Sequence, residues 1–257
     1  MICLEMNTAQ EKVESLEGTL QYCLALNNSV KVDFRPARDL EILKPKDLPD
    51  KLPLSTAAGQ ARLMHDLGSI ELQAMELGVR TLLEFPDAPR EFREELAEIT
   101  RGEKRHFEMC LRVLEDLGHP WRSFPTHMAL WNSTSCEDSL LDRILIVHRY
   151  LEGSGLDASE GILRKLNGTE SRLSKPVVET ILREEVDHVA FGSKWYHQIC
   201  KDQKIDSTHD FGSRMNKLRV QLPKRMERIS KPLRLNAGFT ESEIEFLESW
   251  RDQYFKR

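Results

Sequence analysis

The chain has 257 residues, a net charge of -5 and 40% hydrophobic residues, with 13 glycines and 11 prolines. This composition indicates a soluble, mainly helical protein, and the mild charge neither favours nor excludes a polyanionic partner. The chain has no run of 18 apolar residues, and its five scattered cysteines form no Cys-x-x-Cys pair. These features argue against a membrane span and a disulfide framework. We therefore expect a cytoplasmic protein with reduced thiols and no membrane partner.

The first 56 residues are predicted to be an N-terminal helix followed by an irregular strap. Apolar residues recur at helical spacing over residues 8–27. Residues 28–54 contain four prolines among many charged residues. Because proline interrupts both helices and central strands, we expect this segment to be ordered but irregular, and not a domain of its own.

Residues 57–84 and 89–117 are predicted to form a helical hairpin. Both stretches carry apolar residues at spacings of three and four, which is typical of helices that bury one face. Pro86 and Pro89 stand in the short segment between them. Two prolines forbid helix continuation, and Pro89 suits a first helical turn, so the chain should reverse at this point.

Two carboxylates and a histidine lie on the apolar faces of this hairpin. Glu103 and His106 are three residues apart, which places both on one face of the second helix. Glu71 lies on an apolar face of the first helix, and Asp87 is midway between Glu71 and Glu103. Residues equidistant from an antiparallel turn lie at the same height, so the two carboxylates should face each other roughly 20 Å from the turn.

A second predicted hairpin repeats this arrangement. Helices are expected over residues 137–166 and 175–200, joined at an Asn-Gly turn dipeptide. Glu152 occupies the apolar face of the first helix, and Glu185 and His188 form a second Glu-x-x-His on the apolar face of the next. Glu152 and Glu185 are again symmetric about the turn, so the second hairpin should also bring a carboxylate opposite a Glu-x-x-His.

The two hairpins together predict a dinuclear metal site. A Glu from each of two helices and a Glu-x-x-His from each of two others form the di-iron or di-manganese site of ferritin-like bundles. Carboxylate and imidazole ligands suit iron and manganese, and the set contains no thiolate. We therefore expect two iron ions, with manganese or a mixed centre as alternatives. The expected ligands are Glu71, Glu103, His106, Glu152, Glu185 and His188.

Several positions leave alternatives open. Glu76 rivals Glu71 and Glu184 rivals Glu185, although Glu76 lies on a different helix face and breaks the symmetry about the turn. His148 precedes Glu152 by one turn, where it could orient that carboxylate or be an ordinary core histidine. Gly153 and Gly155 are unfavourable inside a helix, and they could admit a substrate or permit close packing or a local bulge. The alternative to a metal site is a purely structural set of buried ion pairs.

The fold prediction is an all-α, ferritin-like four-helix bundle over residues 57–200. The connection over residues 118–136 is long enough to run back along a helix, as the long crossover between helices two and three of such bundles does. Residues 201–257 are expected to form a C-terminal helical extension, with helices over 211–222 and 241–255.

The C-terminal extension contains two further features. Thr240 followed by Glu243 suggests a capping box at the start of its last helix. Residues 214–234 include eight basic residues and one acidic residue. This basic stretch could contact phosphates, but a solvated surface that balances acidic parts elsewhere is the simpler interpretation.

Four segments carry a resemblance to known proteins. They are HDLGSIELQAME from His65, EKRHFE from Glu103, HRYLEGSGLD from His148 and REEVDHVAF from Arg183. They resemble a bacterial ferritin-like family of unassigned function over most of the chain. Over residues 57–200 they are distantly similar to the tRNA-modifying non-haem di-iron monooxygenases. The resemblance implies the same six ligands that helix geometry indicates.

One position departs from the pattern of many ferritin-like di-iron enzymes. These enzymes carry an acidic residue directly before each Glu-x-x-His, where it orients a histidine. Glu184 matches this pattern before Glu185, but Gly102 stands before Glu103. One histidine therefore lacks the expected partner, which bears on oxygenase competence.

The expected function is that of an O2-dependent oxidoreductase or hydroxylase with a dinuclear non-haem iron centre. Its substrate would be a small molecule or, as the resemblance implies, a modified tRNA base, and it would need an electron donor. One alternative is a ferritin-like iron-binding or ferroxidase protein. Another is a non-catalytic interaction protein that a metal stabilises. These alternatives differ in whether the protein consumes O2 and whether it needs an organic substrate.

Overall fold

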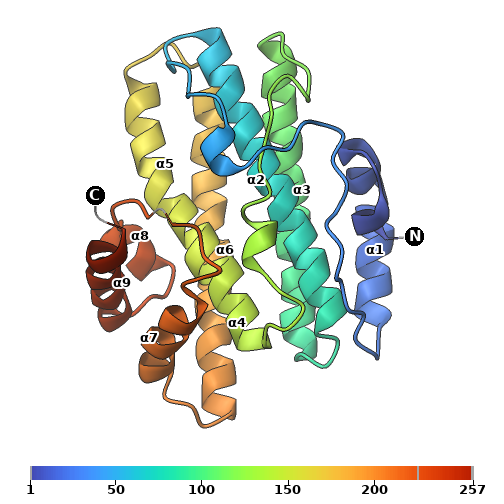
Figure 1. The fold of residues 1–257 in the computed structure, drawn as a ribbon, viewed down its shortest axis with the longest axis vertical. Coiled ribbons are helices and arrows are strands. Elements are labelled where there is room, and N and C mark those ends of the chain that lie inside the picture. Colours follow the sequence, from blue (N-terminus) through green and yellow to red (C-terminus); the bar gives the residue numbers. More distant parts are fainter. Residues whose placement is uncertain (1, 225, 256–257) are drawn as a thin grey trace. The chain divides into compact units, whose positions relative to one another are not determined.

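The computed structural model describes residues 2–224 and 226–255, and these residues form helices joined by irregular segments (Figure 1). The described residues contain no β-strand, and Ile42 and Thr126 form one isolated parallel bridge. The prediction of an all-α fold is confirmed. The α-helices are α1 (Ala9–Ala25), α2 (Ala57–Glu84), α3 (Arg90–Asp116), α4 (Leu140–Ile144), α5 (Glu152–Asn167), α6 (Ser174–Asp202), α7 (Ser207–Leu218), α8 (Lys231–Asn236) and α9 (Glu241–Tyr254). Shorter elements are the 3-10 helices η1 (Cys3–Glu5), η2 (Pro45–Asp47) and η3 (Trp131–Ser133) and the π-helix η4 (Leu145–Leu151).

The chain divides into two compact units. The N-terminal unit comprises Met1–Cys136 and Lys165–Val177, and the C-terminal unit comprises Glu137–Arg164 and Val178–Arg257. The predicted four-helix bundle takes two helices from each unit. These helices are compatible with a ferritin-like bundle, which stays a prediction, as does the division at residues 56 and 200.

The hairpin of α2 and α3 forms the centre of the N-terminal unit, and the two helices lie side by side in Figure 1. Thr56 caps α2 by accepting a hydrogen bond from the Gly59 backbone, and α3 begins directly after Pro89. The two helices approach closely at Gly78, where an added Cβ would lie 2.2 Å from the Thr100 hydroxyl oxygen. The predicted hairpin is therefore confirmed, and glycine permits this close contact.

Two irregular segments run along α2. In the strap, the Val30 backbone N–H donates to the Leu83 carbonyl. In the crossover, Trp121 stacks on His65, whereas the Trp131 ring lies under the Arg80 guanidinium. The crossover thus runs back along α2 from one end towards the other, as its length predicts. Both segments cover a helix that is buried almost all round.

A buried ion-pair cluster joins the N-terminal helix and the strap to α2. Glu76 of α2 is fully buried and lies 2.9 Å from the ammonium nitrogen of Lys12, which is also fully buried. Arg38 of the strap donates two hydrogen bonds to the same carboxylate. Paired charges of this kind are tolerated in a core because each charge is compensated.

The C-terminal unit contains a helix that changes type along its length. The predicted helix over residues 137–166 is observed as α4, η4 and α5 in succession, so a π-helix separates two α-helical parts. Alongside it, Gly192 of α6 lies where an added Cβ would be 2.5 Å from the Cβ of His148. Glycine at this position of α6 therefore permits close packing against η4.

The C-terminal helices are largely as predicted. Thr240 accepts a hydrogen bond from the Glu243 backbone, and the Glu243 carboxylate accepts one from the Thr240 backbone, so the capping box at α9 is confirmed. Helix α7 begins at Ser207, four residues before the expected start, because the Asp206 side chain caps it. The short helix α8 carries Pro232 in its first turn and was not predicted.

Replacing Gly78 by alanine tests the close contact within the hairpin. Alanine favours a helix by about 1 kcal/mol, but overpacking against Thr100 costs about 1–3 kcal/mol, so Gly78→Ala should lower the free energy of unfolding. Urea unfolding measures this change. A second substitution, Thr100→Ala, should restore most of the loss. Gly18→Ala in α1, where an added Cβ meets nothing within 4 Å, is the matched control and should not destabilise.

His65 predicts a dependence of stability on pH. Its ring is fully buried, and neither ring nitrogen has a hydrogen-bond partner among the described residues. Burial, with a smaller contribution from the Arg62 charge, lowers the pKa of His65 to about 4. Below pH 6.5 the unfolded chain therefore binds a proton at His65 that the folded protein does not bind. The free energy of unfolding should consequently fall as the pH is lowered from 6.5 to 4, by up to about 3 kcal/mol.

The unfolding free energy at several pH values measures this effect. His65→Leu removes the proton-binding group without breaking a hydrogen bond, so it should flatten the decline between pH 6.5 and 4. Phe124→Leu alters a ring that packs edge-on against His65 and should lower stability equally across this range. An unchanged pH dependence in His65→Leu would contradict the assignment.

Candidate metal centre

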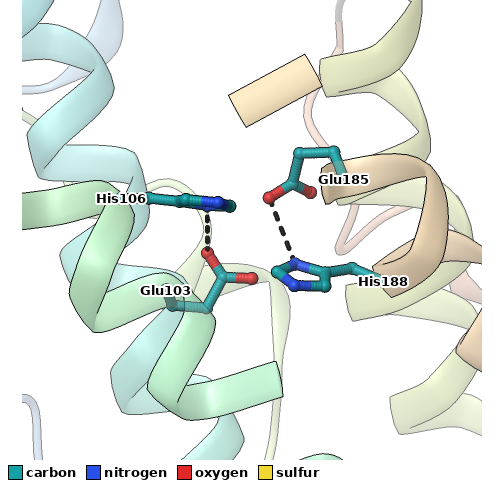
Figure 2. Close-up of side chains that lie close together, drawn as sticks. All are labelled: Glu103, His106, Glu185 and His188. Atoms are coloured by element: carbon teal, nitrogen blue, oxygen red, sulfur yellow. Dashed lines mark ion pairs between the residues drawn. The ribbon is translucent and has the colours of Figure 1, made fainter. Parts of the chain in front are cut away.

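The N-terminal half-site consists of Glu71 from α2 and Glu103 and His106 from α3. All three are buried, with 4%, 2% and 0% of their surfaces exposed, respectively. His106 Nδ1 lies 3.5 Å from a Glu71 oxygen and 3.7 Å from a Glu103 oxygen. Figure 2 shows the Glu103 carboxylate and the His106 ring directed towards each other from α3. The hairpin thus brings Glu71 and Glu103 near one histidine, and their role as metal ligands stays a prediction.

The C-terminal half-site contains Glu185 and His188 from α6. Both residues are buried, and Glu185 Oε1 lies 3.2 Å from His188 Nδ1 (Figure 2). The spacing of three residues therefore produces on α6 the same type of pair that it produces on α3. The role of Glu152 as a further ligand stays a prediction.

Glu152 itself is paired with His148. The residues lie four positions apart across the junction of η4 and α5, and His148 Nδ1 is 2.9 Å from both carboxylate oxygens. His148 is 2% exposed, and its Nε2 atom has no hydrogen-bond partner among the described residues. This contact favours the interpretation that His148 orients Glu152.

The donor chemistry of the half-sites fits a metal ion. Glu103 and His106 on α3, like Glu185 and His188 on α6, are buried residues of the kind that could hold a metal ion. Carboxylates and imidazoles are the ligands that iron and manganese accept, although these donors do not define the metal. Burial, with a contribution from the Glu71 charge, raises the pKa of Cys110 well above its usual range. In the metal-free protein this neighbouring cysteine is therefore a neutral thiol.

The structure separates the predicted ligands from their sequence rivals. The Glu76 carboxylate is engaged by Lys12 and Arg38, so its burial is explained without a metal. The Glu184 side chain is 33% exposed and lies 3.6 Å from Arg183. Both observations favour the residues chosen for their place on the apolar face.

Part of the basic stretch serves the fold. The Arg214 guanidinium lies 2.6 Å from Asp142, and Lys217 approaches the same carboxylate to 3.4 Å. Arg234 is fully buried and is paired with Asp157. Arg225 lies outside the described residues. Three cations of the stretch therefore pair with carboxylates, and the buried Arg234 is not part of a solvated surface.

Sequence reasoning did not predict the π-helix before Glu152. The glycines at positions 153 and 155 were its sequence signal, and a local bulge was one of the alternatives they left open. An added Cβ at Gly153 would lie 2.1 Å from Arg234 Nη1, whereas one at Gly155 would meet nothing within 4 Å. Gly153 therefore accommodates a side chain from far along the chain.

Substitution by glutamine should distinguish Glu71 from Glu76. Glu71→Gln keeps the shape but weakens the ligand, with little loss of stability in the metal-free protein. Co2+ affinity should fall by more than about 10-fold, since even the loss of a group that only supports a ligand costs about 10- to 100-fold. Glu76→Gln leaves Lys12 and Arg38 buried without their counter-charge, so it should lower the free energy of unfolding by about 3–5 kcal/mol. Chemical unfolding and Co2+ titration measure the two effects. Equal behaviour of the variants would contradict these assignments.

Among the described residues, no helix is long and apolar enough to cross a membrane. Residues 5–245 match a family described as "Protein of unknown function (DUF455)". The chain is also 30% identical over 214 residues to a Haemophilus influenzae protein described as "Uncharacterized protein", covering 80% of this chain and 73% of that protein. No solved structure matches the chain. Since the family match spans nearly the whole sequence, the chain belongs to the DUF455 family.

Proposed function

We propose that the two half-sites bind one dinuclear non-haem iron centre in a ferritin-like bundle, with Glu71 and Glu152 as the carboxylates contributed by the neighbouring helices. The observation that carries this proposal is the N-terminal half-site. Two carboxylates from different helices lie around one buried histidine. Burying carboxylates together is costly, and bound cations would offset that cost.

The C-terminal half-site supplies the second part of the argument. Its Glu-x-x-His pair is buried like the pair on α3, and His148 holds the carboxylate of Glu152 one turn away. Histidines and carboxylates that bind metals are commonly oriented by such hydrogen bonds. In the proposed bundle, Glu103 and His106 face Glu185 and His188, and each pair binds one of two iron ions, with manganese or a mixed centre as alternatives.

The proposed activity is that of an O2-dependent oxidoreductase or hydroxylase. When bound, a dinuclear iron centre supplies electrons to O2, and an external electron donor would restore them. The protein would fix the ligand positions, keep bulk water away through the apolar faces of α2, α3 and α6, and hold the substrate. The resemblance to tRNA-modifying monooxygenases supports a modified base as one substrate class, with a small molecule as the other. This chemistry would take place in the cytoplasm.

Metal analysis tests the proposal directly. Protein from iron- and manganese-supplemented cells should contain about two metal ions per chain. Glu103→Ala and Glu185→Ala should each lower that content, because each removes a ligand from a different unit. Asp187→Ala changes an exposed neighbour of His188 and should retain the parent content. Elemental analysis of the purified proteins gives the answer.

The outcomes separate the functional alternatives. No stoichiometric metal in the parent protein would eliminate the proposal and leave buried ion pairs. If metal is bound, O2 consumption by the ferrous protein separates an oxidoreductase from a protein that a metal only stabilises. Catalytic ferrous oxidation without an organic substrate would favour ferroxidase activity. Metal retained in Glu185→Ala but lost in Glu103→Ala would show that the two half-sites do not share a centre.

A further inference from the structure

The π-helix η4 is anchored by the segment that follows α6. The Arg149 guanidinium of η4 donates hydrogen bonds of 2.8 and 2.9 Å to the two oxygens of Glu243 in α9. The Tyr150 hydroxyl donates to the Pro223 carbonyl at 3.0 Å. Two successive residues of η4 are therefore anchored to residues more than 70 positions later in the chain.

Arg234 makes a third contact, and it reaches the backbone. Its Nη1 atom donates a 2.8 Å hydrogen bond to the Arg149 carbonyl oxygen inside the helix. The same guanidinium passes Gly153, where an added Cβ would lie 2.1 Å from Nη1 and 2.6 Å from Cζ. Arg234 is fully buried. Its side chain therefore occupies the space beside the helix that a residue larger than glycine would fill.

Asp157 holds Arg234 in this position. Its carboxylate accepts hydrogen bonds from Nη2 at 2.7 Å and from Nε at 3.3 Å. It also accepts one from the Ser230 backbone N–H at 2.8 Å, just before α8 begins. The guanidinium thus links Asp157 of α5 to the Arg149 carbonyl of η4. A lysine could not make this link, since a single ammonium lacks the planar fork of donors.

Glu152 lies between the two points that Arg234 contacts. Its backbone N–H donates to the Val147 carbonyl, five residues back, which is the π-helical pattern. Its carboxylate accepts from His148, whose own position depends on η4. A side chain that inserts beside a helix is a recognised cause of a local change in its hydrogen bonding. The Arg234 contact therefore lies where the helix changes from π to α and where the Glu152 side chain is held.

We propose that Arg234 is a positioning residue, which holds the junction of η4 and α5 and thereby fixes the His148–Glu152 pair for metal binding. This inference rests on the proposed metal centre for its purpose. The contact of Arg234 with the junction of η4 and α5 does not depend on any metal. Through Arg234, the C-terminal segment would contribute to the metal centre without providing a ligand.

Three single variants test the proposal. Arg234→Lys retains the charge beside Asp157 but loses the second donor. Gly153→Ala leaves every charge in place and displaces the guanidinium. Gly155→Ala is the matched control, because it lies two residues further along the same helix, where an added Cβ meets nothing within 4 Å.

Hydrogen exchange of the metal-free proteins reports on the helix. Residues 145–157 should exchange faster in Arg234→Lys and Gly153→Ala than in the parent and Gly155→Ala, while α3 should be unchanged in all four. In an Arg234→Ala background, Gly153→Ala should add no further acceleration, because the two substitutions remove one shared contact. Parent-like exchange in both Arg234→Lys and Gly153→Ala would overturn the proposal.

Titration with Co2+ alone reports on positioning. The affinity should fall about 10- to 100-fold in Arg234→Lys and Gly153→Ala, the range typical when a group that supports a ligand is lost, and it should be retained in Gly155→Ala. Faster exchange with unchanged Co2+ affinity would overturn the positioning role. Absence of Co2+ binding in the parent would instead overturn the metal centre and, with it, the positioning role, while the exchange results would still establish the hold of Arg234 on the helix.

Discussion

Burying a charged side chain costs free energy, and this cost explains why the buried carboxylates of this protein have charged partners. Several carboxylates in the core are matched by cations: Glu76 by Lys12 and Arg38, and Asp157 by Arg234. Glu243 belongs to the same class. Burial alone would raise its pKa, but hydrogen bonds from His197 and Arg149 hold that pKa well below its usual range. Each of these pairs fastens one segment of the chain to another.

The carboxylates of the half-sites have histidines among their neighbours. Glu71 and Glu103 lie around His106, and Glu185 lies beside His188. A histidine is a weaker counter-charge than arginine or lysine near neutral pH, because it carries only a fractional charge. In the proposed centre, bound metal ions would supply further positive charge beside these carboxylates.

Helical periodicity was sufficient to predict the long helices and the N-terminal half-site. Glu71 and Glu103 could be paired from sequence because they are equally far along the chain from one short turn. A regular helix converts equal numbers of residues into equal distances in space. The same reasoning was insufficient for the helix that carries Glu152. Its π-helical turn accompanies contacts with Glu243, Pro223 and Arg234, far along the chain. Local spacing contains no information about contacts of that kind, although the unusual glycines marked the place.

The irregular segments show a similar limit. Prolines predicted that the strap would be neither helix nor strand, but not that its Arg38 would reach Glu76 or that Ile42 would pair with Thr126. Side chains of opposite charge are numerous in this sequence, and their pairing depends on the path of the chain in space. Element type was therefore predictable where the pattern is local. The choice of partners was not.

The buried pair of Lys12 and Glu76 has a consequence for how the chain is made. Translation produces α1 well before the carboxylate that will neutralise Lys12, because 64 residues separate the two positions. Domains generally fold as units, and an unpaired ammonium resists transfer out of water. The side of α1 that carries Lys12 can therefore be buried with its charge compensated only after α2 has emerged. Closure of the N-terminal unit around this ion pair thus requires both helices.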